Sequence, residues 1–222
     1  MRDPRPLGKA RLHYFDLNKG PWSDLDGQVS FLPSRLPFIQ ESGDVFAIAP
    51  MIPDKKPAGA NFYPEDMTKE EFEAWASKLP KAQQEIARGF FSVIRRAADK
   101  KLTAIPYSKA YAADIEKAAK LLEEGAAATT NATLKTFLTL RAKAFRDDDY
   151  YASDVAWMKL DAPIDVTMGP YETYQDELFG YKAAFESFVT LKNPEESKQL
   201  ERFKRYLRDM EANLPVAEKY KN

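Results

Sequence analysis

The sequence contains no cysteine and a single histidine, His13. Without cysteine the chain can form no disulfide, no thiolate nucleophile and no cysteine-ligated zinc or iron–sulfur site. One histidine also excludes a His-Glu-x-x-His zinc motif, which needs two. A lone histidine is more often structural than catalytic, because catalysis requires a positioned partner. We therefore expect this chain to bind no metal by itself.

Long apolar runs are also lacking. No stretch approaches the roughly 18 apolar residues of a membrane-spanning helix, and no apolar segment of an export signal follows the charged start. We therefore expect no membrane partner. The cytoplasm is the favoured compartment, while a periplasmic location would need an export signal upstream of these residues.

An excess of charge of one sign is missing as well. Charged residues make up 30% of the chain, yet the formal net charge is only −1. The chain has no positive long-range electrostatic field that would attract a polyanion, and no stretch in which basic and aromatic residues alternate. We therefore expect no nucleic-acid partner. Glycine-rich phosphate loops and the Gly-x-Ser-x-Gly motif are absent too, which argues against nucleotide binding and serine hydrolysis.

The residues that are present predict a folded α+β protein in which helices predominate. At 222 residues with 44% hydrophobic side chains, the chain can bury a sizeable core as a single domain or lobe, 1–222. Residues 1–66 are rich in loops and contain short strands, one of them at 45–49. Residues 67–160 are helical, 161–192 form a β element, and 193–214 form a C-terminal helix.

Capping signals and apolar stripes locate the helices. Thr68 and Glu71 form a capping box that begins a helix. A further stripe predicts a second helix from 81 to 101, a third closes at Gly125, and a fourth opens near Asn131. Asn193 begins the last helix, for which the spacing predicts this buried stripe: Leu200, Phe203, Leu207 and Met210.

Two strands make up the β element, which we expect to be antiparallel. Residues 163–170 and 184–191 alternate and are β-branched or aromatic. Polar residues after the first strand and the turn formers Gly169-Pro170 are placed where a scaffold presents groups to a ligand: Glu172, Tyr174, Asp176 and Glu177. The alternative is that Glu177 belongs to a short helix and the nearby tyrosines pack the core. The residues alone leave both interpretations open.

Three segments resemble the dipeptidyl peptidase III family, particularly its bacterial branch: 149–157 (DYYASDVAW), 163–174 (PIDVTMGPYETY) and 178–189 (LFGYKAAFESFV). Segments 18–27 (NKGPWSDLDG) and 56–64 (KPAGANFYP) are also similar to those relatives. The resemblance covers most of residues 12–220.

This resemblance implies a two-lobed zinc exopeptidase that removes dipeptides from the N-terminus of an oligopeptide. The family pattern Gly-x-x-Glu-x-Tyr matches Gly169, Glu172 and Tyr174. By resemblance Glu172 binds the substrate ammonium, Gly169 and Tyr171 also contact substrate, and Tyr174 donates a hydrogen bond near the scissile carbonyl. A carboxylate and a phenol suit those tasks.

The sequence departs from the family in lacking the histidine pair that, with a later glutamate, holds zinc. We therefore expect the N-terminal, substrate-binding portion of such a hydrolase, inactive until a C-terminal zinc-binding lobe is supplied. Whether the chain acts as an enzyme is left open. The alternative is a stand-alone module that binds peptides or acts as a scaffold without chemistry. Plant relatives can be fused to a Nudix domain, but no Nudix box occurs here.

A portion of a larger protein should leave its partner-facing surface uncovered. The sequence interpretation therefore predicts an exposed apolar patch of several hundred Å². A uniformly polar surface would instead favour an independent protein.

Overall fold

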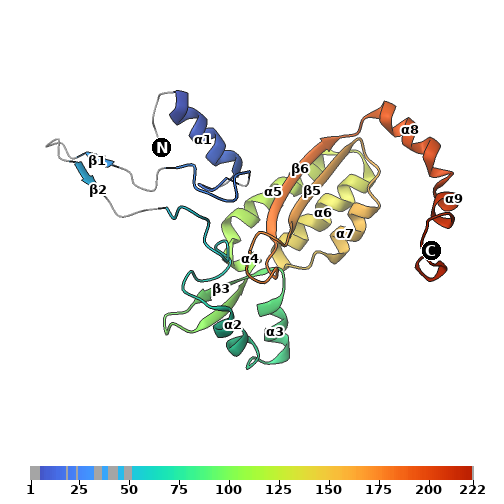
Figure 1. Ribbon diagram of the computed structural model, residues 1–222. Helices are drawn as coiled ribbons and strands as arrows, with labels where there is room; N and C mark the ends of the chain where they lie inside the picture. Colours follow the sequence, from blue (N-terminus) through green and yellow to red (C-terminus); the bar gives the residue numbers. More distant parts are fainter. Residues whose placement is uncertain are drawn as a thin grey trace. The chain divides into compact units, whose positions relative to one another are not determined.

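The computed structural model describes residues 6–18, 20–23, 25–32, 37–39, 45–47 and 52–221. They form an α+β structure in which helices predominate, as the sequence predicts (Figure 1). The chain divides into two compact units. The first comprises Met1–Ile105 and Thr173–Ala183, and the second comprises Pro106–Glu172 and Ala184–Asn222. The compactness of the two units does not show whether each can fold independently. That residues 1–222 form a single domain therefore stays a prediction.

The described elements up to residue 106 are α1 (Pro6–Asn18), β1 (Pro37–Ile39), β2 (Val45–Ala47), α2 (Lys69–Ala76), α3 (Lys81–Arg88), β3 (Ser92–Arg96) and β4 (Leu102–Pro106). The later ones are α4 (Tyr107–Ala110), α5 (Ala112–Ala128), α6 (Ala132–Asp147), α7 (Tyr151–Met158), β5 (Ile164–Glu172), β6 (Ala184–Leu191), α8 (Pro194–Lys204), α9 (Leu207–Ala212) and a 3-10 turn, Glu218–Tyr220. Strands pair as β1–β2, β3–β4 and β5–β6.

The N-terminal region differs from the prediction by one helix. Short strands occur as expected, although residues 48 and 49 of the predicted strand lie outside the described residues. The prediction of loops and short strands for 1–66 did not include a helix, whereas α1 spans Pro6–Asn18. Its leucines remain exposed, so no apolar stripe announced it. Pro6 at the first helical position was the available signal.

In the first unit, α2 begins as predicted, since the Thr68 hydroxyl accepts a hydrogen bond from the Glu71 amide at 3.1 Å. The predicted helix from 81 to 101 is wrong beyond its first half. Helix α3 ends at Arg88, before Gly89, and β3 and β4 then form an antiparallel ribbon. Val93 is β-branched and, like Ile94, is buried, which favours a strand here over a helix.

In the second unit, α5 and α6 pack along their length and α7 packs on α6. Asn131 caps α6 as predicted, because its side chain accepts a hydrogen bond from the Leu134 amide at 2.9 Å. Gly125 does not end α5, which continues to Ala128. A side chain at this position would lie close to Leu138, so a small residue suits the contact between the two helices.

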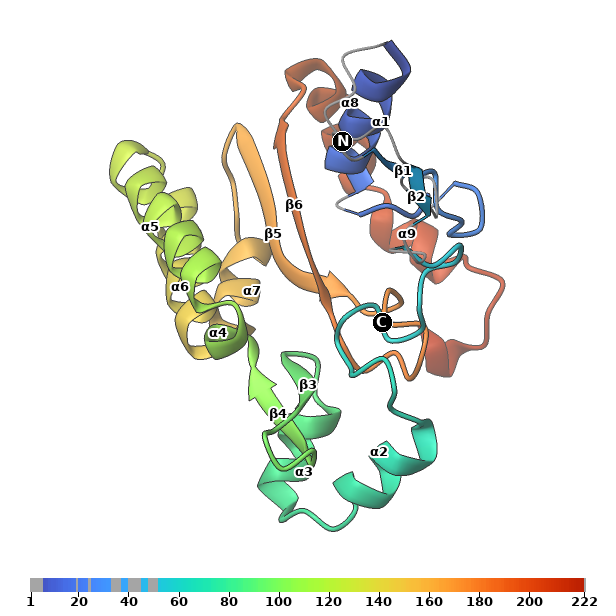
Figure 2. The same cartoon turned by 90° about the vertical axis from the view of Figure 1, so that its left-hand side faces the viewer.

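The β5–β6 hairpin confirms the predicted antiparallel element, with β5 extending two residues further, to Glu172. Phe185 of β6 packs on Tyr107 and Phe145, with ring centroids 5.5 and 5.9 Å apart. The hairpin thus lies along the α5–α7 helices, as Figures 1 and 2 show. This packing fixes the strand end that carries Glu172.

The C-terminal helices begin as predicted but are not buried as predicted. The Asn193 side chain accepts hydrogen bonds from the amides of Glu195 and Glu196, which caps α8. None of the residues in α8 or α9 is buried, so the expected buried stripe is wrong for this chain alone. Among the described residues, no helix is both long and apolar enough to cross a membrane.

Candidate functional site

Glu172 ends β5 and pairs with Ala184 of β6, beyond an irregularity in the register after Pro170. Glu186 lies two residues further along β6, on the same side of the hairpin as Ala184. The pKa of Glu186 is raised, first by burial and then by the neighbouring carboxylate of Glu172. Two carboxylates therefore converge at this strand end, a surrounding that suits a cationic group.

Tyr174 and Glu177 lie in the turn that follows, within the first unit. The Tyr174 side chain is 69% exposed. Glu177 has a left-handed backbone (φ 49°) and is not helical, so the short-helix alternative is wrong. The packing of tyrosines in that alternative holds for Tyr150, which is buried, and for Tyr181, which stacks on Phe179 at 5.1 Å.

Asp176 organises the turn from inside. Its carboxylate accepts hydrogen bonds from the backbone amides of residues 178–182, at 2.8–3.2 Å, and from the Tyr63 hydroxyl at 3.3 Å. Its own carbonyl accepts from the Gly59 amide at 2.7 Å. A buried carboxylate with this many donors is fully solvated by protein. Asp176 thus connects the backbone of residues 178–182 to Tyr63.

Lys182 connects the same segment to the turn between α3 and β3. Its Nζ donates to the carbonyls of Ala87 and Gly89 and to the Ser92 hydroxyl, at 2.7, 2.8 and 2.9 Å. The Ser92 hydroxyl already donates to the Ile86 carbonyl, so all three Nζ contacts use lysine hydrogens. Burial lowers the pKa of Lys182 to about 7, and the charge of Asp176 opposes that change.

Arg141 is the corresponding buried cation of the second unit. Its Nη2 is 2.6 Å from Asp154 Oδ1. Its guanidinium carbon lies 5.2–5.3 Å from the centroids of three rings: Phe137, Tyr150 and Tyr171. Within the described part of the chain, Nε and Nη1 have no hydrogen-bond acceptor. The charge is therefore held by one carboxylate and by aromatic faces.

Gly169 and Tyr171 connect this cation to the end of β5. The Tyr171 hydroxyl donates to Asp154 Oδ1 at 2.8 Å, and its pKa is raised, mainly by burial. A Cβ at Gly169 would lie 2.8 Å from Arg141 Nη1 and 2.9 Å from the Tyr171 ring. Glycine is needed here because the guanidinium occupies the space of a side chain. Both residues support the strand that ends in Glu172.

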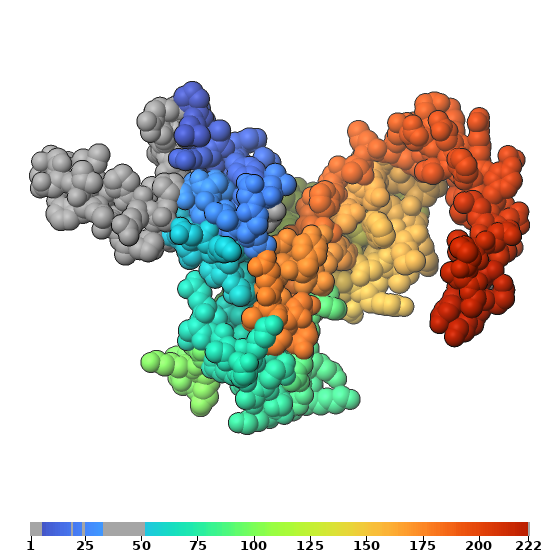
Figure 3. Space-filling view, viewed as in Figure 1, coloured from blue at the N-terminus to red at the C-terminus, as the bar shows by residue number. Residues whose placement is uncertain are grey.

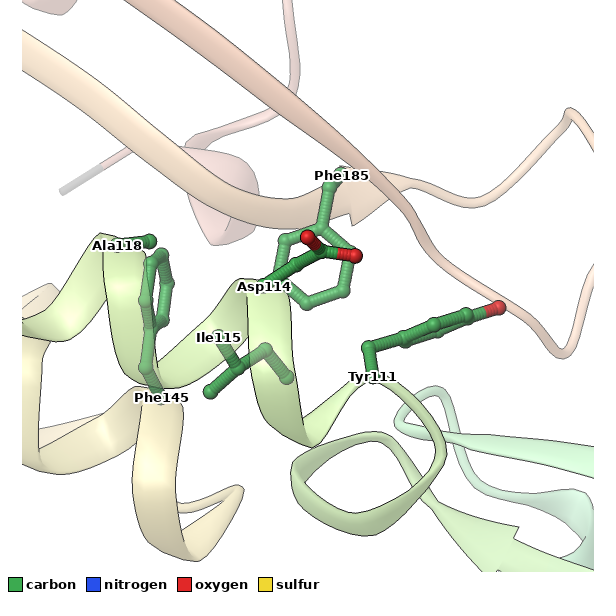
Figure 4. A pocket seen from close by; sticks show the side chains of 6 residues that line it. All are labelled: Tyr111, Asp114, Ile115, Ala118, Phe145 and Phe185. Carbon is green, nitrogen blue, oxygen red and sulfur yellow. The ribbon is translucent and has the colours of Figure 1, made fainter.

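A separate apolar pocket of about 290 Å³ opens between α5, α6 and β6. Its walls include Tyr111, Ile115 and Phe185, and Asp114 is the one carboxylate that lines it (Figure 4). Phe185 lines this pocket, and neighbouring strand residues face opposite sides, so Glu186 points away from it. The pocket is thus distinct from the surroundings of Glu172.

Within the part of the chain that the structure describes, metal-binding side chains do not gather in one place. Among the described residues, no three histidines, cysteines or acidic residues are placed to hold an ion together. His13 is exposed on α1. Zinc in a protein takes three or four such ligands, so these residues do not fit a zinc ion.

Sequence reasoning missed the supports of the site. Arg141 falls in the apolar stripe of α6, seven residues after Leu134, and a charge on a buried stripe signals a buried partner. Asp176 was selected as a residue presented to a ligand, but it is buried and its carboxylate binds the backbone of its own turn. The Gly180 that follows it has a left-handed backbone (φ 70°), and an Asp before such a residue is typical of a turn. Glu186 was identifiable only from the strand register.

Two comparisons place the chain among known proteins. The model of peptidase family M49 matches residues 92–222, more than half of the chain. The chain is also 38% identical to Nudix hydrolase 3 of Arabidopsis thaliana, in a match that covers 97% of this chain and 32% of that protein.

Two solved structures are similar over the whole chain. Dipeptidyl-peptidase III from Corallococcus sp. strain EGB is 46% identical, with a TM-score of 0.79 over 99% of this chain and 38% of that one. DPP III from Caldithrix abyssi is 44% identical, with a TM-score of 0.80 over 100% of this chain and 38% of that one. The chain thus spans about a third of the length of the proteins that it matches.

Proposed function

Because the chain belongs to peptidase family M49, we propose that it is the substrate-binding portion of a dipeptidyl-peptidase III-like hydrolase, which removes dipeptides from peptide N-termini. The observation that carries this proposal is the pair of carboxylates at the end of β5, within a chain that matches two dipeptidyl-peptidase III structures along its length. The Nudix name of the plant relative contributes nothing, because no Nudix box occurs in this sequence.

Glu172 binds the free N-terminus of the peptide. An ammonium group placed beside Glu172 lowers the repulsion between this carboxylate and Glu186, so binding gains from both charges. Acetylation removes the positive charge and with it this gain. Tyr174 donates its hydroxyl hydrogen to the oxygen on which negative charge develops during hydrolysis.

The zinc of the intact enzyme is bound outside these 222 residues, because the sequence has a single histidine and no His-Glu-x-x-His motif. The family's zinc polarises the scissile carbonyl and activates water when it is bound. The residues of this chain bind and orient the peptide. By itself the chain is inactive.

Calorimetric titration with a free-amine tetrapeptide and its acetylated form tests this role. We expect the free amine to bind at least about 10-fold more tightly, as one charge-assisted hydrogen bond implies. Glu172→Gln removes the preference, whereas the matched control Glu177→Gln, an exposed carboxylate on the turn, retains it. Equal binding of both peptides to the unmodified chain contradicts the role of Glu172.

Turnover separates the two functional classes. With zinc added, the pure chain should release no dipeptide. Hydrolysis that Glu172→Gln abolishes would show a complete enzyme instead. Selective binding without turnover, in a protein that gains no activity from the rest of a family enzyme, identifies the stand-alone binding module.

A further inference from the structure

One stripe of apolar side chains on the last two helices has no partner in the described structure. The α8–α9 face consists of Leu200 and Phe203 of α8, Leu207 and Met210 of α9, and Leu214, which follows α9. The first four are 67%, 58%, 55% and 56% exposed. On the side that faces the viewer in Figure 3, no other segment lies over these helices, which are orange-red to dark red.

The spacing of this face is that of a packed helix. Leu200 and Phe203 are three residues apart on α8, and Leu207 and Met210 are three residues apart on α9, so each helix carries an apolar pair on one side. Such pairs are typical of helix–helix contact. In the same unit, α6 has a comparable stripe in Leu134, Phe137 and Leu138, all of them buried. The α8–α9 face therefore has the design of an interior surface.

We infer that the α8–α9 face docks onto the part of an M49 peptidase that these 222 residues do not contain. This inference rests on the proposed function. The family model includes both helices, and the solved relatives continue well beyond the 38% of their chains that is matched. A covering segment is thus available in the relatives, and an apolar stripe needs an apolar partner.

The charges on these helices argue against a lipid surface as the occupant. Acidic and basic residues alternate along α8 and pair with each other, as Lys198 does with Glu195 and Lys204 with Glu201. Binding to anionic lipid requires a basic face, which this pairing does not provide. The face is apolar and its surroundings are close to neutral.

Co-expression tests the inference directly. The tagged chain is produced together with the remaining part of the Caldithrix abyssi enzyme, and that enzyme's own matching segment serves as the reference pair. We expect stoichiometric co-purification. Phe203→Asp with Leu207→Asp should weaken association at least about 100-fold, since two large apolar side chains lose their burial. The control Lys198→Asp with Arg202→Asp lies on the opposite side of α8 and should assemble normally.

The Glu172→Gln variant should also co-purify normally, because Glu172 is not part of the α8–α9 face. Co-purification therefore tests docking alone, and the peptide titration tests the role of Glu172. Assembly of the reference pair but not of this chain overturns the inference, as does equal assembly of the Phe203–Leu207 variant.

Experiments on the isolated chain decide among other occupants. Hydrogen exchange should be fast at the amides of α8 and α9, and slow exchange in a monomer would show that the chain covers its own face. A dimer that dissociates on the Phe203–Leu207 substitutions would identify a second copy as the occupant. Binding of the unmodified chain to vesicles with anionic lipid, lost in that variant, would identify a membrane. Each of these results overturns the inference.

Discussion

Among the described residues, two cations are fully buried, and they are held in different ways. Lys182, in the first unit, is surrounded by oxygens, since three acceptors and the nearby Asp176 match its charge. Arg141, in the second unit, has one carboxylate and otherwise aromatic rings. Each cation supports the backbone next to one proposed site residue, Lys182 after Tyr174 and Arg141 before Glu172. The comparison teaches that neighbours in sequence depend on unrelated networks.

The largest effect should come from removing the carboxylate at the centre of the oxygen-rich network. Asp176→Ala leaves five backbone amides without their acceptor and removes the negative charge that favours the protonated form of buried Lys182. We therefore expect a loss of roughly 4 kcal/mol in the free energy of unfolding. Urea denaturation measures it. Glu177→Ala, on the same turn but exposed, should change stability by less than about 0.5 kcal/mol. A similar loss in both variants would mean that the turn is merely fragile.

Lys182→Met should have the second largest effect, a loss of about 3 kcal/mol in the free energy of unfolding. Three oxygens lose their hydrogen-bond donor in a site closed to water. The measurement is made at pH 6, below the pKa of about 7, where the lysine carries its proton. A stability equal to that of the unmodified protein would show that the ammonium is not required there.

Gly169→Ala tests the aromatic network around Arg141 by steric crowding, without removing any of its side chains. The added methyl group would lie 2.8 Å from Arg141 Nη1, and we expect it to cost about 2 kcal/mol as the guanidinium and Tyr171 move apart. Gly27→Ala provides the comparison, since it also has a positive φ but nothing lies within 4 Å of its Cβ. Equal losses would assign the effect to backbone conformation rather than to the crowded guanidinium.

Arg141→Met should have the smallest effect, a loss of about 1 kcal/mol in the free energy of unfolding. Its carboxylate partner Asp154 is 44% exposed and can turn to water, and an apolar side chain suits the three rings. Thermal unfolding of the methionine variants of Arg141 and Lys182 compares the networks. An Arg141→Met variant less stable than Lys182→Met would reverse the ranking and show that cation–ring contacts dominate.

The fold was predictable where a cap and an apolar stripe coincide, as they do in α2 and α6. It was not predictable where tertiary contacts decide, as in β3, whose apolar residues also fit a helix. For the site, Glu172 and Tyr174 could be selected from the sequence, and their roles stay predictions. Lys182 could not be selected, because its acceptors lie far earlier in the chain. Glu186 needed the strand register, and Arg141 gave only the signal of a charge within an apolar stripe.

The segment Thr173–Ala183 has a consequence for biosynthesis. It completes the first unit, yet the ribosome must make all of α4 to β5 before it reaches Thr173. At roughly 5–20 residues per second, several seconds pass before Thr173–Ala183 is added to the first unit. The first unit can complete its folding only after most of the second unit has been synthesised. A chaperone that binds nascent chains would therefore meet the first unit while it is incomplete.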